Sequence, residues 1–189
     1  MNQRNWTPAE NEFFAENTVI EIMPSFKGDK FDFICGGYGP FRPSKPASVP
    51  LWLAVYLKQR NKCDIQVPNW LDLEFLKKVK QEERHADWAD KFTEVIPYYY
   101  YEVGRLLLTE CKDDFAQPQQ VISVLEDIKE IRKEKLLRKM RSIDPDTPIH
   151  YLSYVGAHEI SQLRPVLQEA YGTINRMQTI KEKASQEQE

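Results

Sequence analysis

In the first fifty residues, apolar side chains occur in short runs separated by glycine and proline, which is typical of β-strands. Two such runs are 18–24 (TVIEIMP) and 30–36 (KFDFICG), and the intervening SFKGD can form a turn. We therefore expect these two segments to pair as a hairpin. Residues 36–46 (GGYGPFRPSKP) contain too much glycine and proline for a regular helix. A short helix is expected to begin at Thr7-Pro8, a typical helix start.

From residue 48 onward the apolar spacing becomes helical. Asn69 is expected to cap the second predicted helix, with Asp72 in a contact resembling a capping box. Residues 144–151 (DPDTPIHY) are expected to break the chain between the last two helices. Helices are predicted over residues 50–62, 70–87, 98–111 and 119–143, with a last one from about residue 161.

The two long helices each carry an apolar stripe. The stripe of the helix 119–143 consists of Val121, Leu125, Ile128, either Ile131 or Arg132, Leu136 and Met140. The stripe of the last helix consists of Leu163, Val166, Leu167, Ala170, Tyr171, Ile174 and Met177.

These patterns predict an α+β fold, with a mainly α-helical bundle domain after a small N-terminal β-rich domain. A unit of about 50 residues without a disulfide or metal normally needs a neighbour to be stable. The predicted organisation is a β-rich domain (1–48), a linking helix and connection (49–66), a helical domain (67–182) and a flexible tail (183–189).

The linking helix is apolar on every side and ends in a polar, basic turn. Its apolar positions include Leu51, Trp52, Val55 and Tyr56, and the turn begins with Lys58, Gln59 and Arg60. One small domain rarely covers all sides of such a helix. We therefore expect these residues to lie at a junction between domains or subunits, with the polar ones forming hydrogen bonds around it.

A run of four tyrosines, Tyr98, Tyr99, Tyr100 and Tyr101, follows Pro97. Successive residues of a helix are rotated by about 100°, so four of them would cover every face. At least one ring should then point away from the chain's own core. Tyrosine is enriched at protein interfaces because it has a large apolar body and a polar tip. The run therefore favours a protein that binds other proteins.

Composition narrows the class of protein. The chain has 189 residues and is 41% hydrophobic, enough for a real core, and its net charge of −3 argues against a general nucleic-acid coat. The three cysteines, Cys35, Cys63 and Cys111, show no CxxC spacing, so we expect reduced, buried thiols. The polar N-terminal segment does not resemble a signal peptide. We expect a soluble intracellular protein without a membrane contact.

The sequence contains no strong motif for a catalytic or ligand-binding site. The cluster GGYGPF lacks the GK[ST] of a phosphate-binding loop, so a structural turn is the better interpretation. His85, His150 and His158 lie in no metal-binding motif. His158 and Glu159 could form an acid–base pair, but no nucleophile motif accompanies them. The segment 129–141 (KEIRKEKLLRKMR) is the best candidate for a nucleic-acid surface, although its interleaved acidic residues favour a solvated or partner-facing helix. No enzyme activity and no cofactor are indicated.

The order of several motifs resembles one family, the Psf-two subunits of GINS, a four-subunit assembly of eukaryotic DNA replication. The segment VPLWLAVYLKQRNKC is the most specific. The other matching segments are IMPSF, GGYGPFRP, VPNWLDLEFL, PYYYYE with the following LLL, DIKEIRKEKL and EISQLRP. Arg132 and Lys135 lie in DIKEIRKEKL and Arg164 lies in EISQLRP, so we count all three as interface candidates.

The resemblance implies a non-catalytic, nuclear subunit of the GINS heterotetramer, which scaffolds and activates the MCM replicative helicase in initiation and elongation. The implied partners are three sibling subunits, the MCM ring and a further accessory protein. Contact with a replisome polymerase would be indirect, and contact with DNA indirect or weak. The alternative is a nuclear DNA-binding adaptor that uses the basic helix 129–141.

Overall fold

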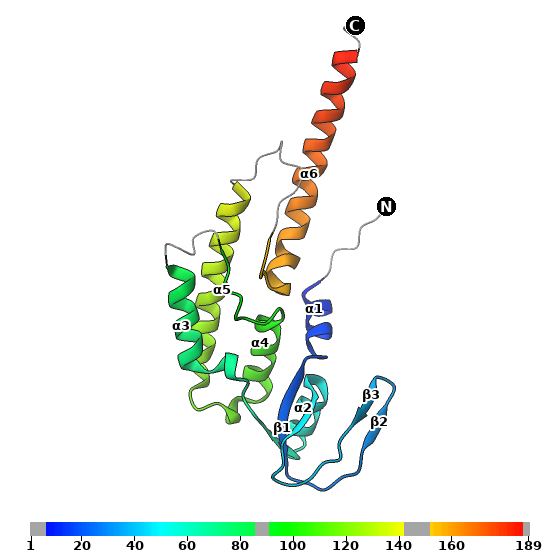
Figure 1. Cartoon of the computed structure of the whole chain (residues 1–189), viewed down its shortest axis with the longest axis vertical. Coiled ribbons are helices and arrows are strands. Elements are labelled where there is room, and N and C mark those ends of the chain that lie inside the picture. Colours follow the sequence, from blue (N-terminus) through cyan, green and yellow to red (C-terminus); the bar gives the residue numbers. More distant parts are fainter. Residues whose placement is uncertain (1–6, 86–90, 142–151, 187–189) are drawn as a thin grey trace.

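The computed structural model describes residues 7–85, 91–141 and 152–186. Figure 1 shows the strands at one end of the molecule, a bundle of helices next to them, and a long last helix whose C-terminal half extends past the bundle. The fold is α+β and mainly helical, as the sequence predicts.

A three-stranded antiparallel sheet forms from segments that are distant in sequence. Strand β1 (Val19–Pro24) lies between β4 (Ala47–Pro50) and β5 (Cys63–Ile65). Ile20 and Ile22 of β1 point into the core while the alternate residues Val19 and Glu21 are exposed, the pattern of a sheet buried on one face. The sheet therefore extends beyond the expected β-rich unit 1–48 and includes residues up to Ile65.

The expected hairpin between residues 18–24 and 30–36 is wrong. Both edges of β1 are occupied by β4 and β5, and β2 (Phe31–Phe33) pairs instead with β3 (Gly36–Tyr38). The two residues that join β2 to β3, Ile34 and Cys35, lack the Asn-Gly pattern typical of a tight hairpin, so this hairpin had no clear sequence signal.

The glycine cluster is only partly the predicted turn, because Gly36–Tyr38 form strand β3 and the irregular part begins at Gly39. Gly36 and Gly39 have φ values of 140° and 114°, which residues with a side chain rarely adopt. Cys35 lies at the tip of the β2–β3 hairpin and is exposed, so the expectation of a buried thiol is wrong for this residue. Burial of the other two thiols raises the pKa of Cys63 to about 11 and that of Cys111 to about 12.

The first two helices begin as the sequence predicts. Helix α1 (Pro8–Ala15) starts with a capping box, in which the Thr7 hydroxyl accepts from the Glu10 amide and the Glu10 carboxylate accepts from the Thr7 amide. Helix α2 (Leu51–Gln59) follows β4 directly, with Pro50 at its N-cap.

Two helices of the bundle begin later than predicted. Asn69 lies in a single 3-10 turn, η1 (Asn69–Leu71), and Asp72 is the residue that caps α3 (Leu73–Arg84). Its carboxylate accepts from the amides of Glu74 and Phe75 at 3.1 and 3.4 Å. Helix α4 (Tyr100–Glu110) starts two residues after Tyr98, whose carbonyl instead accepts from the amide at the start of the last helix.

The two longest helices complete the bundle. After the short 3-10 turn η3 (Lys112–Asp114), α5 (Pro118–Arg141) agrees with the prediction. Helix α6 (Ala157–Gln186) begins earlier than residue 161, because Gly156 donates its amide to the Glu159 carboxylate and so caps the first turn. Pro165 is tolerated inside it. The expected break 144–151 and the end of the tail, 187–189, lie outside the described residues.

One continuous core joins the sheet, α2 and the bundle. It includes Ile22 and Phe41 from the N-terminal part, Leu57 from α2, and Leu107 and Ile128 from α4 and α5. A second, smaller cluster attaches the start of α6 and consists of Phe92, Leu136, Val155 and Leu163. The division of the chain into domains stays a prediction, but the two parts pack on one core.

Candidate interaction surfaces

Hydrogen bonds attach the polar C-terminal end of α2 to neighbouring elements of the chain. Lys58 donates to the carboxylates of Asp64 (3.0 Å) and Asp114 (2.6 Å), and the second Asp114 oxygen accepts from the Ile65 amide of β5. Gln59 donates to Glu110 at the end of α4. These bonds link α2, β5, α4 and η3.

The apolar face of α2 is largely covered by this chain itself. Leu51 is fully buried, and Val55 is half-buried against the core. Trp52 makes edge-to-face contacts with Phe33 (5.3 Å between ring centres) and Tyr38 (6.3 Å), so the β2–β3 hairpin packs on it. Only one aromatic residue of this helix, Tyr56, remains largely exposed.

Arg60 packs on one face of the Tyr56 ring. Its guanidinium lies 3.5 Å from the centre of the Tyr56 ring, and it donates to the Tyr56 carbonyl at 3.4 Å. The junction residues therefore have partners within the chain, and an all-round apolar helix does not by itself require a second protein.

A buried ionic network centres on Arg132 of α5. Its guanidinium donates to Glu83 of α3 at 2.6 Å, to both carboxylate oxygens of Glu159 of α6 at 2.6 and 3.0 Å, and to the Tyr154 carbonyl at 2.7 Å. Arg132 is only 1% exposed. The Tyr100 hydroxyl donates to the same Glu159 carboxylate at 2.9 Å, so Arg132 joins three helices directly and α4 through Glu159.

Lys135, one turn further along α5, completes this network. Its ammonium group contacts the second oxygen of Glu83 and donates to the Lys91 carbonyl. Thr93 donates its amide and its hydroxyl to Glu83. Two cations, Arg132 and Lys135, thus neutralise two carboxylates in a space closed to solvent. We expected both cations at an interface, but in this chain they form internal contacts.

The network makes stability depend on pH. Burial alone would raise the pKa of Glu83, but hydrogen bonds from Lys135 and Thr93 and the charge of Arg132 outweigh it, so the pKa is lowered. A lowered folded-state pKa adds stability above the unfolded value of about 4.5, and this stability is lost as the pH falls through the folded pKa.

We predict that the urea midpoint of the wild type falls steeply below about pH 4.5, while that of Glu83→Gln, already lower at neutral pH, falls less. The comparison isolates Glu83, because Glu102, whose pKa is raised by burial, is common to both proteins. Parallel pH profiles for the two proteins would contradict the assignment.

The tyrosine run does not cover a helix as predicted, because only Tyr100 and Tyr101 are helical. Tyr100 is buried in the network, and burial followed by the charge of Glu159 raises its pKa well above 10. The Tyr101 hydroxyl donates to Glu126 (3.0 Å) and accepts from Lys129 (2.8 Å). The expected outward ring is Tyr98, which is 49% exposed.

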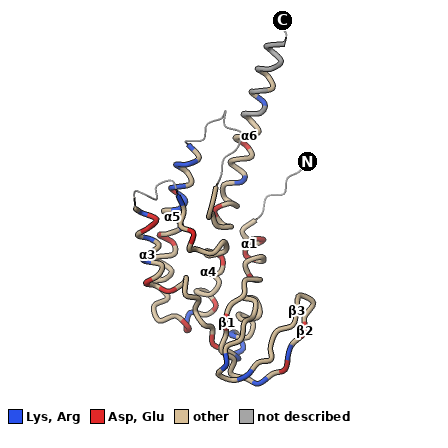
Figure 2. Tube along the Cα trace, in the orientation of Figure 1, with Lys and Arg blue, Asp and Glu red and all other residues tan. Residues whose placement is uncertain are grey.

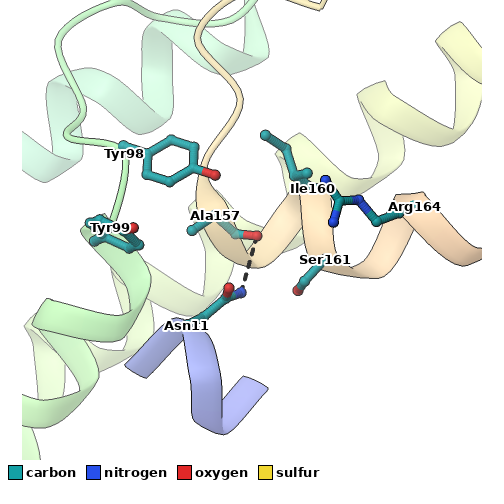
Figure 3. Close-up of a pocket in the computed structure, with 7 residues that line it drawn as sticks. All are labelled: Asn11, Tyr98, Tyr99, Ala157, Ile160, Ser161 and Arg164. Carbon is teal, nitrogen blue, oxygen red and sulfur yellow. Dashed lines mark hydrogen bonds between the residues drawn. The ribbon is translucent and has the colours of Figure 1, made fainter. Parts of the chain in front are cut away.

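Tyr98, Tyr99 and Arg164 come together at a recess of about 180 Å³ between α1, the start of α4 and α6. Figure 3 shows the two tyrosine rings on one side and Arg164 on the other, with Ala157 between them. Asn11 of α1 also lines the recess, and its side chain donates to the Ala157 carbonyl at 3.2 Å. Three residues that the sequence singles out thus share one surface feature.

The apolar stripe predicted for α6 is fully buried only at the start of the helix, and the side chain of Ile174 lies outside the described residues. Leu163 is buried and Leu167 is half-buried, but Val166 and Met177 are 54% and 59% exposed. Ile180, further along the helix, is also exposed. Helical rotation places Val166, Met177 and Ile180 on one face. No described part of the chain covers this exposed apolar face, which we call the α6 stripe.

Charges of both signs are interspersed along α3 and α5 (Figure 2). Within the predicted basic segment, Lys129 is paired with Glu126, and Lys133 lies 3.5 Å from Glu130. Since Arg132 and Lys135 are buried, the segment offers fewer free positive charges than its composition suggests.

Sequence reasoning missed the acidic half of these contacts, namely Glu83, Asp114 and Glu159 in its network role. Arg132 within the α5 stripe was the one available signal, since a charge among apolar positions needs a buried partner. In the described ranges, no cluster of three His, Cys, Asp or Glu residues could hold a metal ion. Among the described helices, none is both long enough and apolar enough to cross a bilayer.

Two family profiles match the chain. The PSF2 N-terminal domain matches residues 7–66 and the GINS complex protein helical bundle domain matches residues 70–170. The human DNA replication complex GINS protein PSF2 is 40% identical over 128 residues, which are 68% of each chain.

Two further relatives match over more of the chain. The DNA replication complex GINS protein psf2 of Schizosaccharomyces pombe is 31% identical over 183 residues, 97% of this chain and 95% of its own. The probable DNA replication complex GINS protein PSF2 of Drosophila melanogaster is 32% identical over 172 residues, 90% of this chain and 83% of its own. The resemblance seen in the sequence is confirmed: the chain belongs to the PSF2 family of GINS complex proteins.

Proposed function

We propose that the chain is a subunit of a GINS heterotetramer in DNA replication and that it works in the nucleus with three sibling subunits. Relatives that align over 90% and 97% of the chain bear the name DNA replication complex GINS protein PSF2. The α6 stripe is the structural observation that carries the proposal, because its exposed Val166, Met177 and Ile180 gain stability only when another surface covers them.

The proposed role is to scaffold and activate the MCM replicative helicase in initiation and elongation, together with a further accessory protein. A replisome polymerase would be reached indirectly. The subunit itself is proposed to be non-catalytic. The candidate acid–base pair supports this, since the Glu159 carboxylate is held by Arg132, Tyr100 and the Gly156 amide and is therefore committed to the fold.

We predict that co-expression with the three sibling subunits yields an equimolar complex, while the chain expressed alone self-associates through the α6 stripe. Native mass spectrometry of the purified material gives the stoichiometry directly. A monodisperse monomer with no affinity for the siblings would contradict the proposal.

The alternative, a DNA-binding adaptor that uses residues 129–141, is weakened by the internal pairing of that segment. Direct DNA contact is proposed to be weak at most. A DNA affinity that falls steeply with salt and with charge reversal at Arg138 would favour the adaptor instead.

A further inference from the structure

Glu102 of α4 is a buried carboxylate without a partner. Its side chain is 6% exposed, and neither carboxylate oxygen has a hydrogen-bond partner among the described residues. Burying an ionised carboxylate is costly unless it is paired and hydrogen-bonded. The contrast with Glu83 and Glu159 is plain, because each of those accepts several hydrogen bonds from buried donors.

Glu102 lines a recess of about 220 Å³ between α1, α4 and the first turn of α6. The other lining residues are Pro8, Glu12, Tyr101, Arg105 and His158. One water occupies roughly 30 Å³ in the liquid, so the recess has room for a larger group. The ring of Pro8 and the aromatic face of Tyr101 offer apolar surface for an aliphatic side-chain stem.

The charges around the recess favour a cation. The guanidinium of Arg105 is paired with Glu12, and it is more than half exposed. Burial, followed by the charge of Lys129, lowers the pKa of His158, so its imidazole is neutral at pH 7. Burial also raises the pKa of Glu102, and the charges of Glu159 and Glu12 act in the same direction, outweighing its own backbone amide and the charge of Arg105. Because Arg105 forms its ion pair with Glu12, Glu102 is the carboxylate at this recess without an ion pair.

We propose that this recess is a socket for a lysine or arginine side chain of a protein partner, whose cationic head pairs with Glu102. The identity of the partner as a sibling subunit rests on the proposed function. The recess lies at the base of α6, next to the recess of Tyr98 and Arg164, which shares the first turn of that helix.

The test compares wild type, Glu102→Gln and the control Glu130→Gln, which removes the same charge from an exposed position on α5. We expect Glu102→Gln to leave the Tm of the isolated chain unchanged or higher, since it removes an unpaired buried charge. Its affinity for the complex of the three siblings should fall at least fivefold. Glu130→Gln should change neither quantity.

A second probe is independent of the siblings. Butylammonium chloride carries the head and stem of a lysine side chain, and it should raise the Tm of the wild type more than equal sodium chloride does, but not that of Glu102→Gln. If the wild type fails to bind the siblings, the proposed function is wrong, and the Tm shift caused by butylammonium alone shows whether the recess binds a cation.

Two results with Glu102→Gln would overturn the inference: an affinity for the siblings within fivefold of that of the wild type, or a clear fall in the Tm of the variant. If the wild type does not bind the siblings, an equal effect of butylammonium on the Tm of the wild type and of Glu102→Gln would overturn it.

Discussion

Replacing Arg132 with alanine should destabilise the chain by about 3–5 kcal/mol, the usual cost of breaking a buried ion pair by removing one partner. The substitution leaves Glu159 without its main counter-charge and Glu83 with Lys135 alone, both out of contact with water. Because Arg132 bonds to α3 and α6 and to the Tyr154 carbonyl, the start of α6 should also detach from the bundle.

Chemical unfolding of the isolated chain at low micromolar concentration measures this cost. Amide exchange at residues 157–163 reports the detachment of α6. The matched control is Lys133→Ala on the adjacent, exposed position of α5, where the expected change is within about 0.5 kcal/mol. Equal stabilities of the Arg132 and Lys133 variants would show that the network does not hold the bundle together.

The second large effect is expected on assembly rather than on folding. Val166→Asp and Met177→Asp both place a charge on the exposed α6 stripe, so the stability of the isolated chain should change little. In a complex each charge would be buried in an apolar contact. We expect each to weaken binding of the sibling subunits roughly 30-fold, corresponding to about 2 kcal/mol.

The two positions are separated by about 16 Å along the helix, so their effects should add and the double variant should lose roughly a thousandfold in affinity. Gln168→Asp places the same charge on the opposite face of α6 and should retain binding. If all three variants bind equally well, the stripe is not the contact, whatever else joins the subunits.

The sequence was informative where a local signal determines the structure. Thr7 followed by Pro8 predicted the start of α1, and the apolar spacing after Pro118 predicted α5. Val166 and Met177 of the α6 stripe belonged to the predicted apolar pattern, although their exposure was not predicted, because exposure depends on what else packs there. The order of motifs along the chain also indicated the correct family.

The largest failures concern contacts between distant segments. No local feature shows that β1 pairs with residues 47–50 and 63–65 rather than with its neighbour 31–33. The burial of Arg132 and Lys135 depends on Glu83 and Glu159, which lie 49 and 27 residues away from Arg132. For the same reason α2 looked like a helix in need of a partner, although the β2–β3 hairpin already covers Trp52.

Hydrogen–deuterium exchange along α6 tests most directly whether another protein covers the stripe. At a concentration low enough to keep the isolated chain monomeric, amides between Val166 and Ile180 should exchange rapidly. They should become strongly protected in the complex with the three siblings, while α5 changes little. Unchanged exchange in this segment on assembly would contradict the account.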